Sequence, residues 1–198
     1  DMDLGDINGD GYADIIFGYA YPNFEDRDYF GDGNSHDTDG VVQVAYGASL
    51  ESLTSDGATW TTFWSPTGSR ESNFGNDIAI GDFNGDGYDD ILIGAPYADE
   101  SDLYDIDSGA VYIIYGQSNL NQWYGEDDYG VTIQLESSYT SNEDSEFGES
   151  VAAGDFNGDG IADLAVSQNE YGLSPGYEGA GFVFVQLSGT ENGIVIHG

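Results

Sequence analysis

The chain has 198 residues, and its 38 Asp and Glu against only 2 Lys and Arg give a formal net charge of −36 at pH 7. A surface this negative repels phosphate backbones and acidic lipid headgroups, so we expect no nucleic-acid partner and no basic membrane-docking patch. The lack of cysteine excludes disulfides, thiol nucleophiles and zinc–thiolate sites, and two histidines provide little material for His-based catalysis. No apolar run reaches the roughly 18 residues of a membrane span, so we expect no membrane insertion. No N-terminal signal pattern is present, and in a secreted protein such a signal would already have been removed.

High net charge alone suggests disorder, but the rest of the composition predicts a folded chain. Hydrophobic residues make up 39% and aromatic residues 14%, which is enough to form a core in a chain of this length. The 30 glycines against 4 prolines fit many tight turns between short strands. Aspartate with glycine and asparagine is typical of turns and cation-binding loops, so the composition favours a folded, all-β, cation-dependent protein.

Three nearly identical segments recur along the chain, at residues 5–14, 81–90 and 154–163. Their first aspartates, Asp6, Asp82 and Asp155, are separated by 76 and 73 residues, and a short apolar run follows each segment. A Phe-Gly pair precedes the second and third segments but not the first. Self-similarity of this kind indicates a repeat architecture.

Each repeat contains four strand candidates separated by turn signals. They cover residues 2–5, 14–17, 41–46 and 59–64 in the first repeat, 77–81, 90–95, 110–115 and 131–136 in the second, and 150–154, 163–167, 181–187 and 194–197 in the third. No window shows an apolar period of helical length. Four strands per repeat, opening with a short strand of small residues, favour the blades of a β-propeller over three hairpin pairs of a solenoid.

The motifs of the second repeat carry a family resemblance. Phe74-Gly75, the acidic loop of residues 82–90, the Gly-Ala-Pro of residues 94–96 and the segment 109–112 resemble an FG-GAP repeat. FG-GAP repeats are the blade units of integrin α-subunit propellers and of many secreted bacterial and archaeal proteins. The resemblance covers nearly the whole chain and implies a propeller of about seven blades.

The predicted fold class is therefore all-β, with three four-stranded antiparallel blades of an FG-GAP or integrin-α-like β-propeller. The expected blade limits within a single propeller segment are residues 1–73, 74–146 and 147–198. The family pattern weakens in the first and third blades, where residues 18–20 and 167–169 replace Gly-Ala-Pro. Closed propellers have roughly 4–8 blades. We therefore expect these three blades to be part of a larger propeller or of one that other copies close, and a stand-alone three-blade monomer is the least favoured state.

Each repeated segment contains the pattern Asp-x-Asn-x-Asp-Gly-x-x-Asp, which we interpret as a calcium loop. Positions 1, 3, 5 and 9 would supply side-chain oxygens and position 7 a carbonyl oxygen, while glycine at position 6 permits the turn. Hard oxygen donors without nitrogen or sulfur favour Ca²⁺ over Mg²⁺ in so flexible a cage. The predicted ligands of the three sites are the side chains of Asp6, Asn8, Asp10 and Asp14, of Asp82, Asn84, Asp86 and Asp90, and of Asp155, Asn157, Asp159 and Asp163, with the carbonyls of Tyr12, Tyr88 and Ile161.

An EF-hand and a metal-free turn are the alternatives to a calcium loop of this kind. An EF-hand places a bidentate Glu at position 12, where this chain has Phe17, Ile93 or Val166, and it needs flanking helices rather than strands. A plain Asp-Asn-Gly turn does not need three aspartates packed together, and three copies make it a poor explanation. The predicted cage would be filled by protein oxygens, so we expect a structural role that is coupled to folding, without catalysis.

The loops between the second and third strands of each blade are acidic and rich in tyrosine, at residues 19–39, 97–108 and 168–178. We expect them on the propeller face opposite the calcium loops. Solvated acidic loops are favoured there over further cation sites, and ordinary packing of the tyrosines is favoured over a ligand platform. We also expect Trp60, Trp64 and Trp123 to lie in blade cores and His36 to be exposed.

These expectations lead to one main functional hypothesis and two alternatives. The chain is predicted to be a calcium-stabilised, non-enzymatic propeller segment of an extracellular or cell-surface protein. It would act in adhesion or assembly through protein or glycan ligands on the face opposite the calcium loops. The alternatives are a structural repeat subunit of an extracellular filament or sheath, in which neighbouring copies pair, and the non-catalytic propeller domain of a larger secreted enzyme. Three Ca²⁺ ions add six positive charges and change −36 only to −30, so the remaining excess favours a marine or halophilic, cation-rich setting.

Overall fold

A computed structural model describes residues 1–20, 40–47, 60–65, 72–98, 109–118, 120, 131–133, 146–168, 182–188 and 194–197. Within these residues the chain forms twelve β-strands. This part of the chain contains no helix with the length and apolar character needed to cross a membrane. In chain order the strands are β1 Met2–Gly5, β2 Asp14–Tyr19, β3 Val41–Ala45, β4 Trp60–Trp64, β5 Ile78–Gly81, β6 Asp90–Ala95, β7 Ala110–Ile114, β8 Val131–Ile133, β9 Val151–Gly154, β10 Asp163–Gln168, β11 Phe182–Gln186 and β12 Ile194–His197.

The twelve strands form three four-stranded antiparallel sheets. In each sheet the strands lie in chain order, β1 to β4, β5 to β8 and β9 to β12, and we call these sheets blade 1, blade 2 and blade 3. The register also repeats, because the last residue of each first strand pairs with the ninth residue of the acidic loop, in the pairs Gly5–Asp14, Gly81–Asp90 and Gly154–Asp163. The predicted all-β fold with three four-stranded blades is confirmed.

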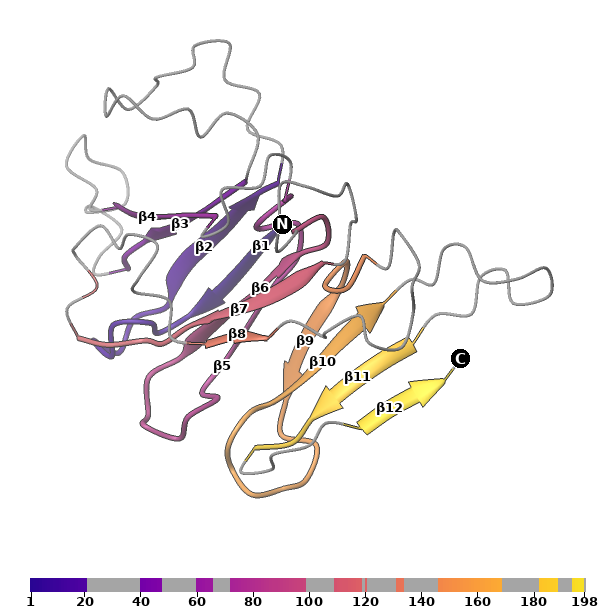
Figure 1. Ribbon diagram of the computed structural model, residues 1–198. Helices are drawn as coiled ribbons and strands as arrows, with labels where there is room; N and C mark the ends of the chain where they lie inside the picture. The colour runs from indigo at the N-terminus through magenta and orange to yellow at the C-terminus, as the bar shows by residue number, and fades with distance from the viewer. Residues whose placement is uncertain are drawn as a thin grey trace, which may run out of the picture.

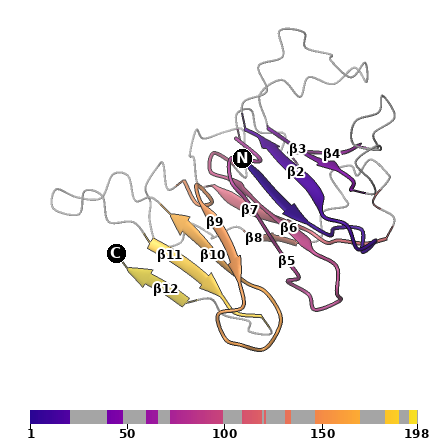
Figure 2. The same ribbon diagram turned by 180° about the vertical axis from the view of Figure 1, so that it is seen from behind.

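The three blades lie side by side, with blade 2 between the other two (Figure 1). The view from behind shows the same order (Figure 2). The first strands of neighbouring blades adjoin, since β1 contacts β5 and β5 contacts β9. Small residues such as Ala79 in β5 and Ala153 in β9 suit this crowded row of first strands, as the sequence predicted.

The first hydrophobic core lies between blades 1 and 2. Ile16 and Val44 of blade 1 pack there with Ile93 and Tyr112 of blade 2, and all four side chains are fully buried. Phe74, which precedes β5, is buried in the same core with its ring edge toward Tyr112, at a centroid distance of 5.5 Å. Because alternate residues of a strand point to opposite faces, one face of blade 1 and one face of blade 2 line this core.

A second hydrophobic core lies between blades 2 and 3. Leu92 of β6 packs there with Leu164 and Phe184 of blade 3. Phe147, which precedes β9, is fully buried beside Phe184, with ring centroids 6.1 Å apart in an edge-to-face arrangement. Leu92 and Ile93 are neighbours in β6 yet belong to different cores. Blade 2 is therefore covered on both faces.

The strands agree with the predicted ranges, apart from one or two residues at some ends. β2 continues past the predicted residue 17 because its last residue, Tyr19, pairs with Val41 of β3. Trp64 is buried as predicted, but Trp60 is 49% exposed, so its assignment to a blade core is wrong. Trp60 lies at the opposite end of β4, on the side of blade 1 that no other described blade covers. Trp123, His36 and residues 134–136 of the predicted last strand of blade 2 lie outside the described residues.

Candidate metal centre

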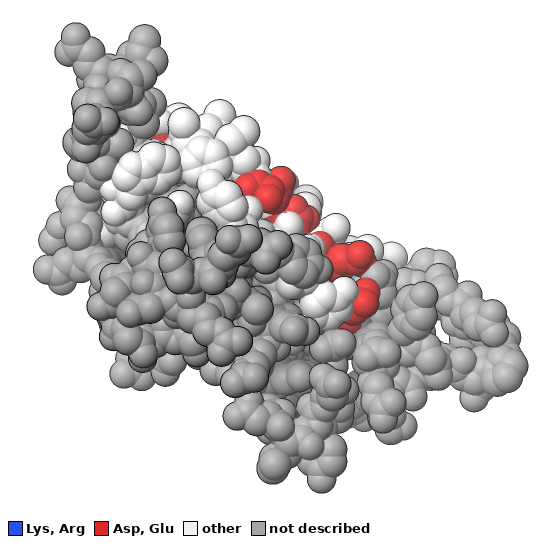
Figure 3. Space-filling view, turned by 90° about the horizontal axis from the view of Figure 1, so that it is seen from above, with Lys and Arg blue, Asp and Glu red and all other residues white. Residues whose placement is uncertain are grey.

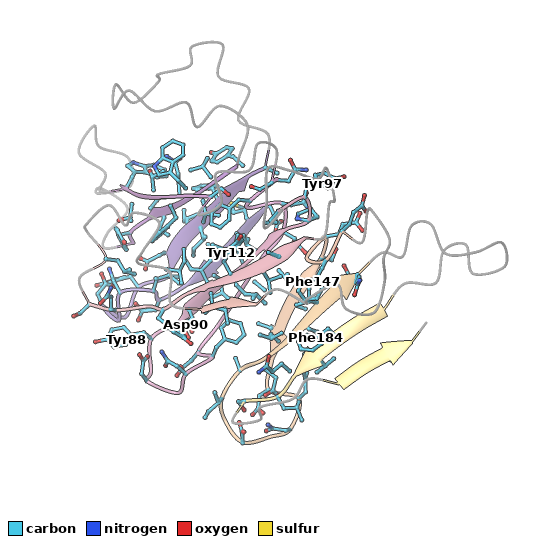
Figure 4. The ribbon with its side chains drawn as sticks, viewed as in Figure 1. Tyr88, Asp90, Tyr97, Tyr112, Phe147 and Phe184 are labelled. Carbon is cyan, nitrogen blue, oxygen red and sulfur yellow. The ribbon has the colours of Figure 1, made fainter. Side chains whose placement is uncertain are left out.

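The three acidic loops join the first strand to the second strand in each blade. They follow β1, β5 and β9 and lie at the same end of the three sheets (Figure 1). In Figure 4, Tyr88 and Asp90 mark this end in blade 2, while Tyr97, which follows β6, lies at the opposite end. The placement agrees with the predicted separation of the acidic loops from the connections between second and third strands.

The first aspartate of each loop accepts hydrogen bonds from the backbone of the same loop. Asp6 Oδ1 accepts the N–H of Asp10 at 3.0 Å, and Asp6 Oδ2 accepts the N–H of Gly11 at 2.9 Å. The same two bonds recur at Asp82, at 3.1 and 2.8 Å, and at Asp155, at 3.1 and 2.9 Å. The repeated sequence therefore produces one loop conformation three times.

The asparagine at position 3 and the aspartate at position 5 complete this arrangement. Asn8 Oδ1 accepts the N–H of Asp10 at 2.9 Å, so two side-chain oxygens, one from Asp6 and one from Asn8, converge on a single N–H. Asp10 Oδ1 in turn accepts the N–H of Tyr12 at 2.9 Å. Corresponding bonds form in the other two loops. Positions 1, 3 and 5 are thus oriented by the backbone of their own loop.

Glycine at position 6 has the conformational role that the sequence predicts. Gly11, Gly87 and Gly160 have φ angles of 87°, 91° and 88°, in the left-handed region that favours glycine. At this point the chain reverses and presents the N–H of position 6 to the first aspartate. A side chain here would strain the turn that holds the carboxylate in place.

The ninth aspartate is buried and fastens the loop to the third strand. Asp90 Oδ2 accepts the N–H of Phe83 at 2.9 Å, and Asp90 Oδ1 accepts the N–H of Gly116, just beyond β7, at 2.8 Å. Equivalent bonds join Asp14 to Ile7 and Gly47 and join Asp163 to Phe156 and Ser188. Sequence reasoning assigned these aspartates to a cation alone and missed this clamp. The small residue two positions after each third strand is the signal that could have revealed it.

The electrostatic environment of the ninth aspartate differs among the blades. Burial raises the pKa of Asp90 to about 6, because its two backbone hydrogen bonds only partly compensate the loss of water and nearby carboxylates add repulsion. Burial likewise raises the pKa of Asp14. Burial also acts on Asp163, but the hydrogen bonds donated by Ser188 and by the loop backbone outweigh it, so the pKa of Asp163 is lowered.

The donor chemistry of the loops fits calcium. Every candidate ligand is a carboxylate, amide or carbonyl oxygen, the type that Ca²⁺ prefers. An ionised carboxylate has about four lone-pair sites, so oxygens that accept N–H groups keep capacity for a cation. In the described part of the chain, no three His, Cys, Asp or Glu side chains form a group that could hold a metal ion. The ligand assignment in the three loops therefore stays a prediction.

Neighbouring loops contact one another across the blade boundary. Asp6 N–H donates to Asp89 Oδ2 at 2.8 Å, and Asp89 N–H donates back to the carbonyl oxygen of Asp6 at 3.2 Å. The ring of Tyr88 lies over Gly9, where a Cβ would be only 2.4 Å from the ring. These contacts join the loops of blades 1 and 2, and sequence reasoning missed them because the partners are far apart in the chain.

The face opposite the acidic loops carries part of the predicted tyrosine set. Tyr19 is 48% exposed and Tyr97 is half-buried there. The other tyrosines of that set lie outside the described residues, as do residues 21–39, 99–108 and 169–178 of the connections between second and third strands. Figure 3 views the molecule from this end and shows acidic side chains in a row, with no Lys or Arg among the described residues.

Comparison with known families identifies the repeat. The profile of the FG-GAP repeat family matches residues 74–114 and 147–185. The chain carries FG-GAP repeats. Each matched segment includes the Phe-Gly pair, the acidic loop and the first three strands of its blade. Blade 1 has the same strand order as these two FG-GAP blades, although the family match does not include it.

The FG-GAP segment is distantly similar to much longer proteins. It is 29% identical over 174 residues to phosphatidylinositol-glycan-specific phospholipase D of Bos taurus, which covers 83% of this chain and 18% of the relative. It is 30% identical over 171 residues to integrin alpha pat-2 of Caenorhabditis briggsae, covering 82% of this chain and 12% of the relative. It is 36% identical over 119 residues to integrin alpha-PS2 of Drosophila melanogaster, covering 57% of this chain and 7% of the relative. The chain thus spans less than a fifth of the length of these relatives. FG-GAP repeats often bind calcium, in agreement with the oxygen donor set.

Proposed function

We propose that this FG-GAP segment is a calcium-stabilised, non-enzymatic part of an extracellular or cell-surface protein that acts in adhesion or assembly. The observation that carries the proposal is the same hydrogen-bonded acidic loop in three successive blades. The matched relatives are extracellular or cell-surface proteins, which supports this location. The net charge of −36 also suits a medium rich in cations, where self-repulsion is screened.

Calcium would supply positive charge to each loop and no covalent chemistry. The carboxylates and amides of positions 1, 3, 5 and 9 and the carbonyl oxygen of position 7 would hold it. In blade 2 the ninth position is Asp90, whose oxygens also accept the N–H groups of Phe83 and Gly116. A cation that favours ionised Asp90 would therefore strengthen the link between the loop and the third strand. Binding would be coupled to folding because the folded loop orients the donors.

Adhesion is proposed through protein or glycan ligands on the face opposite the calcium loops. Exposed Tyr19 on that face offers an aromatic surface with a polar tip, a combination common in binding sites. The similarity to integrin alpha chains supports a binding role over a catalytic one. Assembly with neighbouring blades or copies is the second form of the same proposal.

Thermal unfolding in excess calcium and in excess chelator tests the calcium part of the proposal. At calcium concentrations about a hundredfold above Kd, each occupied site adds about 2.7 kcal/mol to the free energy of unfolding. Chelation by EGTA should therefore lower the melting temperature markedly, and equimolar Mg²⁺ should restore it less well than Ca²⁺. A melting temperature that is the same in EGTA and in calcium would rule out this role.

A second candidate is the non-catalytic propeller of a larger secreted enzyme. The alignment with phosphatidylinositol-glycan-specific phospholipase D over 83% of this chain favours it. A hydrolase domain next to these blades in the full reading frame would support this candidate, and its absence there would exclude it. In either case the 198-residue segment itself should not hydrolyse phosphatidylinositol-glycan, and hydrolysis by the purified segment would contradict the non-enzymatic assignment.

A further inference from the structure

The three acidic loops, which we number 1 to 3 by blade, differ in the residue that follows the third strand. Ser188 follows β11, and its N–H donates to Asp163 of loop 3. The N–H groups of Gly47 and Gly116 donate in the same way to the ninth aspartates of loops 1 and 2. This position is therefore glycine in blades 1 and 2 and serine in blade 3. Only in blade 3 does it bring a hydroxyl group to the acidic loop.

The glycines of blades 1 and 2 lie too close to their loops to carry a side chain. A Cβ on Gly47 would lie 2.2 Å from the carbonyl oxygen of Ala13, and a Cβ on Gly116 would lie 2.2 Å from the carbonyl oxygen of Asp89. Both oxygens belong to the backbone at position 8 of the loop, so a change of rotamer cannot relieve these contacts. Blade 3 accommodates the Cβ of Ser188, so its third strand and its loop meet in a different arrangement.

The hydroxyl of Ser188 bonds to two side chains of loop 3. Its O–H donates to Asp159 Oδ2 at 2.7 Å, and its oxygen accepts a hydrogen bond from Asn157 Nδ2 at 3.3 Å. The amide of Asn157 also donates to Asp159 Oδ2 at 2.9 Å and to Asp163 Oδ1 at 3.4 Å. An amide N–H group therefore lies between the carboxylates of positions 5 and 9, and Ser188 helps to hold it there.

The corresponding asparagines of loops 1 and 2 are held by fewer bonds. Asn8 Nδ2 donates to Asp10 Oδ2 at 3.3 Å, and Asn84 Nδ2 donates to Asp86 Oδ2 at 3.0 Å. Within the described part of the chain, neither amide has a second acceptor. The network that joins positions 3, 5 and 9 to the turn after the third strand is thus a property of loop 3.

The ninth aspartate of loop 3 is also more fully bonded than that of loop 2. Asp163 accepts the N–H groups of Ser188 at 2.6 Å, of Phe156 at 2.7 Å and of Asn157 at 3.2 Å, in addition to the Asn157 side chain. Asp90 accepts two N–H groups. A carboxylate has about four lone-pair sites, so Asp163 keeps less capacity for a cation than Asp90.

We propose that Ser188 is a latch that holds loop 3 in its folded conformation without calcium and makes it the weakest of the three calcium loops. The N–H and O–H donors of Asn157 and Ser188 stabilise carboxylates that otherwise repel one another. Access of a cation to these carboxylates requires the Asn157 amide to leave both of them, at a cost in hydrogen bonds that loops 1 and 2 do not share. The proposal rests on the calcium role proposed above and adds that the dependence of folding on calcium lies mainly in loops 1 and 2.

Hydrogen exchange in EGTA tests the latch in the calcium-free protein. Ser188→Ala removes the hydroxyl and keeps both the Cβ and the N–H that donates to Asp163. Ser118→Ala, at an exposed position two residues beyond Gly116 in the corresponding turn of blade 2, is the matched control. Exchange in residues 155–163 should be about tenfold faster in Ser188→Ala, the low end for loss of a hydrogen bond to a charged group. Residues 6–14 and 82–90, and all three loops of the control, should exchange as in wild type.

Calorimetric titration with calcium tests the order of affinities. Wild type should show two tighter sites and one weaker site, and Asp155→Asn should abolish the weaker site, which assigns it to loop 3. Ser188→Ala should tighten that site by about tenfold, whereas Ser118→Ala should leave all sites unchanged. By linkage, Ser188→Ala should lower the melting temperature more in EGTA than in saturating calcium.

The outcomes separate the latch from the calcium role. Three equal sites, weaker calcium binding by Ser188→Ala, or unchanged exchange in residues 155–163 would overturn the role of Ser188 alone. Wild type that binds no calcium and melts alike in calcium and in EGTA would overturn the calcium role itself. Faster exchange in residues 155–163 of Ser188→Ala would still show, in that case, that the hydroxyl holds the loop.

Discussion

Blades 2 and 3 contain nearly the same acidic loop, but their surroundings differ. Every residue of β6 is buried, whereas three of the six residues of its counterpart in blade 3, β10, are half-buried. Asp90 and Asp163 accept hydrogen bonds from corresponding N–H groups, yet the pKa of Asp90 is raised and the pKa of Asp163 is lowered. The repeated motif sets the local hydrogen bonds, and the neighbouring blades set burial and ionisation.

This difference follows from the way repeat proteins are stabilised. Each repeat contacts only its neighbours, so a central repeat has two interfaces and a terminal repeat has one. Blade 2 contributes to both hydrophobic cores, through Ile93 on one face and Leu92 on the other. Matched substitutions in the two blades should therefore differ in their effects on stability, although the sequences around them are alike.

The largest difference is expected between Gly94 in blade 2 and Ser167 in blade 3. A Cβ on Gly94 would lie 2.1 Å from the carbonyl oxygen of Gly148, a backbone atom that cannot turn aside. Gly94→Ser should therefore lower the free energy of unfolding by about 3 kcal/mol, the upper end of the range for overpacked sites. Urea unfolding monitored by tyrosine and tryptophan fluorescence measures this change.

The reverse substitution in blade 3 is the control. Ser167 Oγ accepts the N–H of Ser150 at 2.9 Å, and Ser167→Gly removes this single exposed hydrogen bond. Its cost, together with the glycine entropy, should stay near 1 kcal/mol. Equal losses at residues 94 and 167 would show that the close approach of blade 3 to Gly94 does not limit the side chain there.

The next effect is a pH dependence that belongs to Asp90 in the calcium-free segment. Its pKa rises from 3.8 to about 6 on folding, so the folded state binds the proton more tightly than the unfolded state. The stability from the neutral carboxyl is fully present below pH 3.8 and is lost as pH rises through about 6. At about 1.4 kcal/mol per pKa unit, we expect the free energy of unfolding to fall by about 2 kcal/mol between pH 4 and pH 7.

Asp163 should have the opposite sign, because its pKa is lowered and its contribution is lost as pH falls below the ordinary value. Urea unfolding in EGTA at several pH values, on wild type and on Asp90→Asn, separates the Asp90 contribution from the general repulsion of an acidic chain. The variant should show a shallower decline between pH 4 and pH 7. The same decline in both proteins would place the effect elsewhere.

Local features of this fold could be predicted from the sequence. The apolar patterns and the turn signals predicted three strands, β1, β6 and β12, with the same first and last residues that the structure shows. The positive φ of Gly87 also follows from the loop pattern alone. These features depend on residues within one hairpin, where sequence spacing and spatial distance are closely related.

Contacts between distant segments could not be predicted in the same way. The clamp from Asp90 to Gly116 depends on where the third strand ends, 26 residues later. The exposure of Trp60 depends on which sheet covers blade 1, and a strand pattern that identifies an apolar face does not identify its neighbour. The contact of Tyr88 with Gly9 joins two repeats, and a repeat alignment superimposes such residues instead of pairing them.

The smallest effect compares two tyrosines at the same loop position, Tyr88 and Tyr12. Tyr88 packs over Gly9 of the preceding loop, whereas Tyr12 is 57% exposed. Tyr88→Ala should lower the free energy of unfolding by about 1 kcal/mol because it removes a partly buried ring, and Tyr12→Ala should change it by less than about 0.5 kcal/mol. Thermal melts in calcium measure both variants.

Tyr12→Ala is the matched control, because the same side chain is removed at the same loop position without a neighbouring glycine beneath it. Equal losses for Tyr88→Ala and Tyr12→Ala would show that the contact of Tyr88 with Gly9 does not stabilise the boundary between blades 1 and 2.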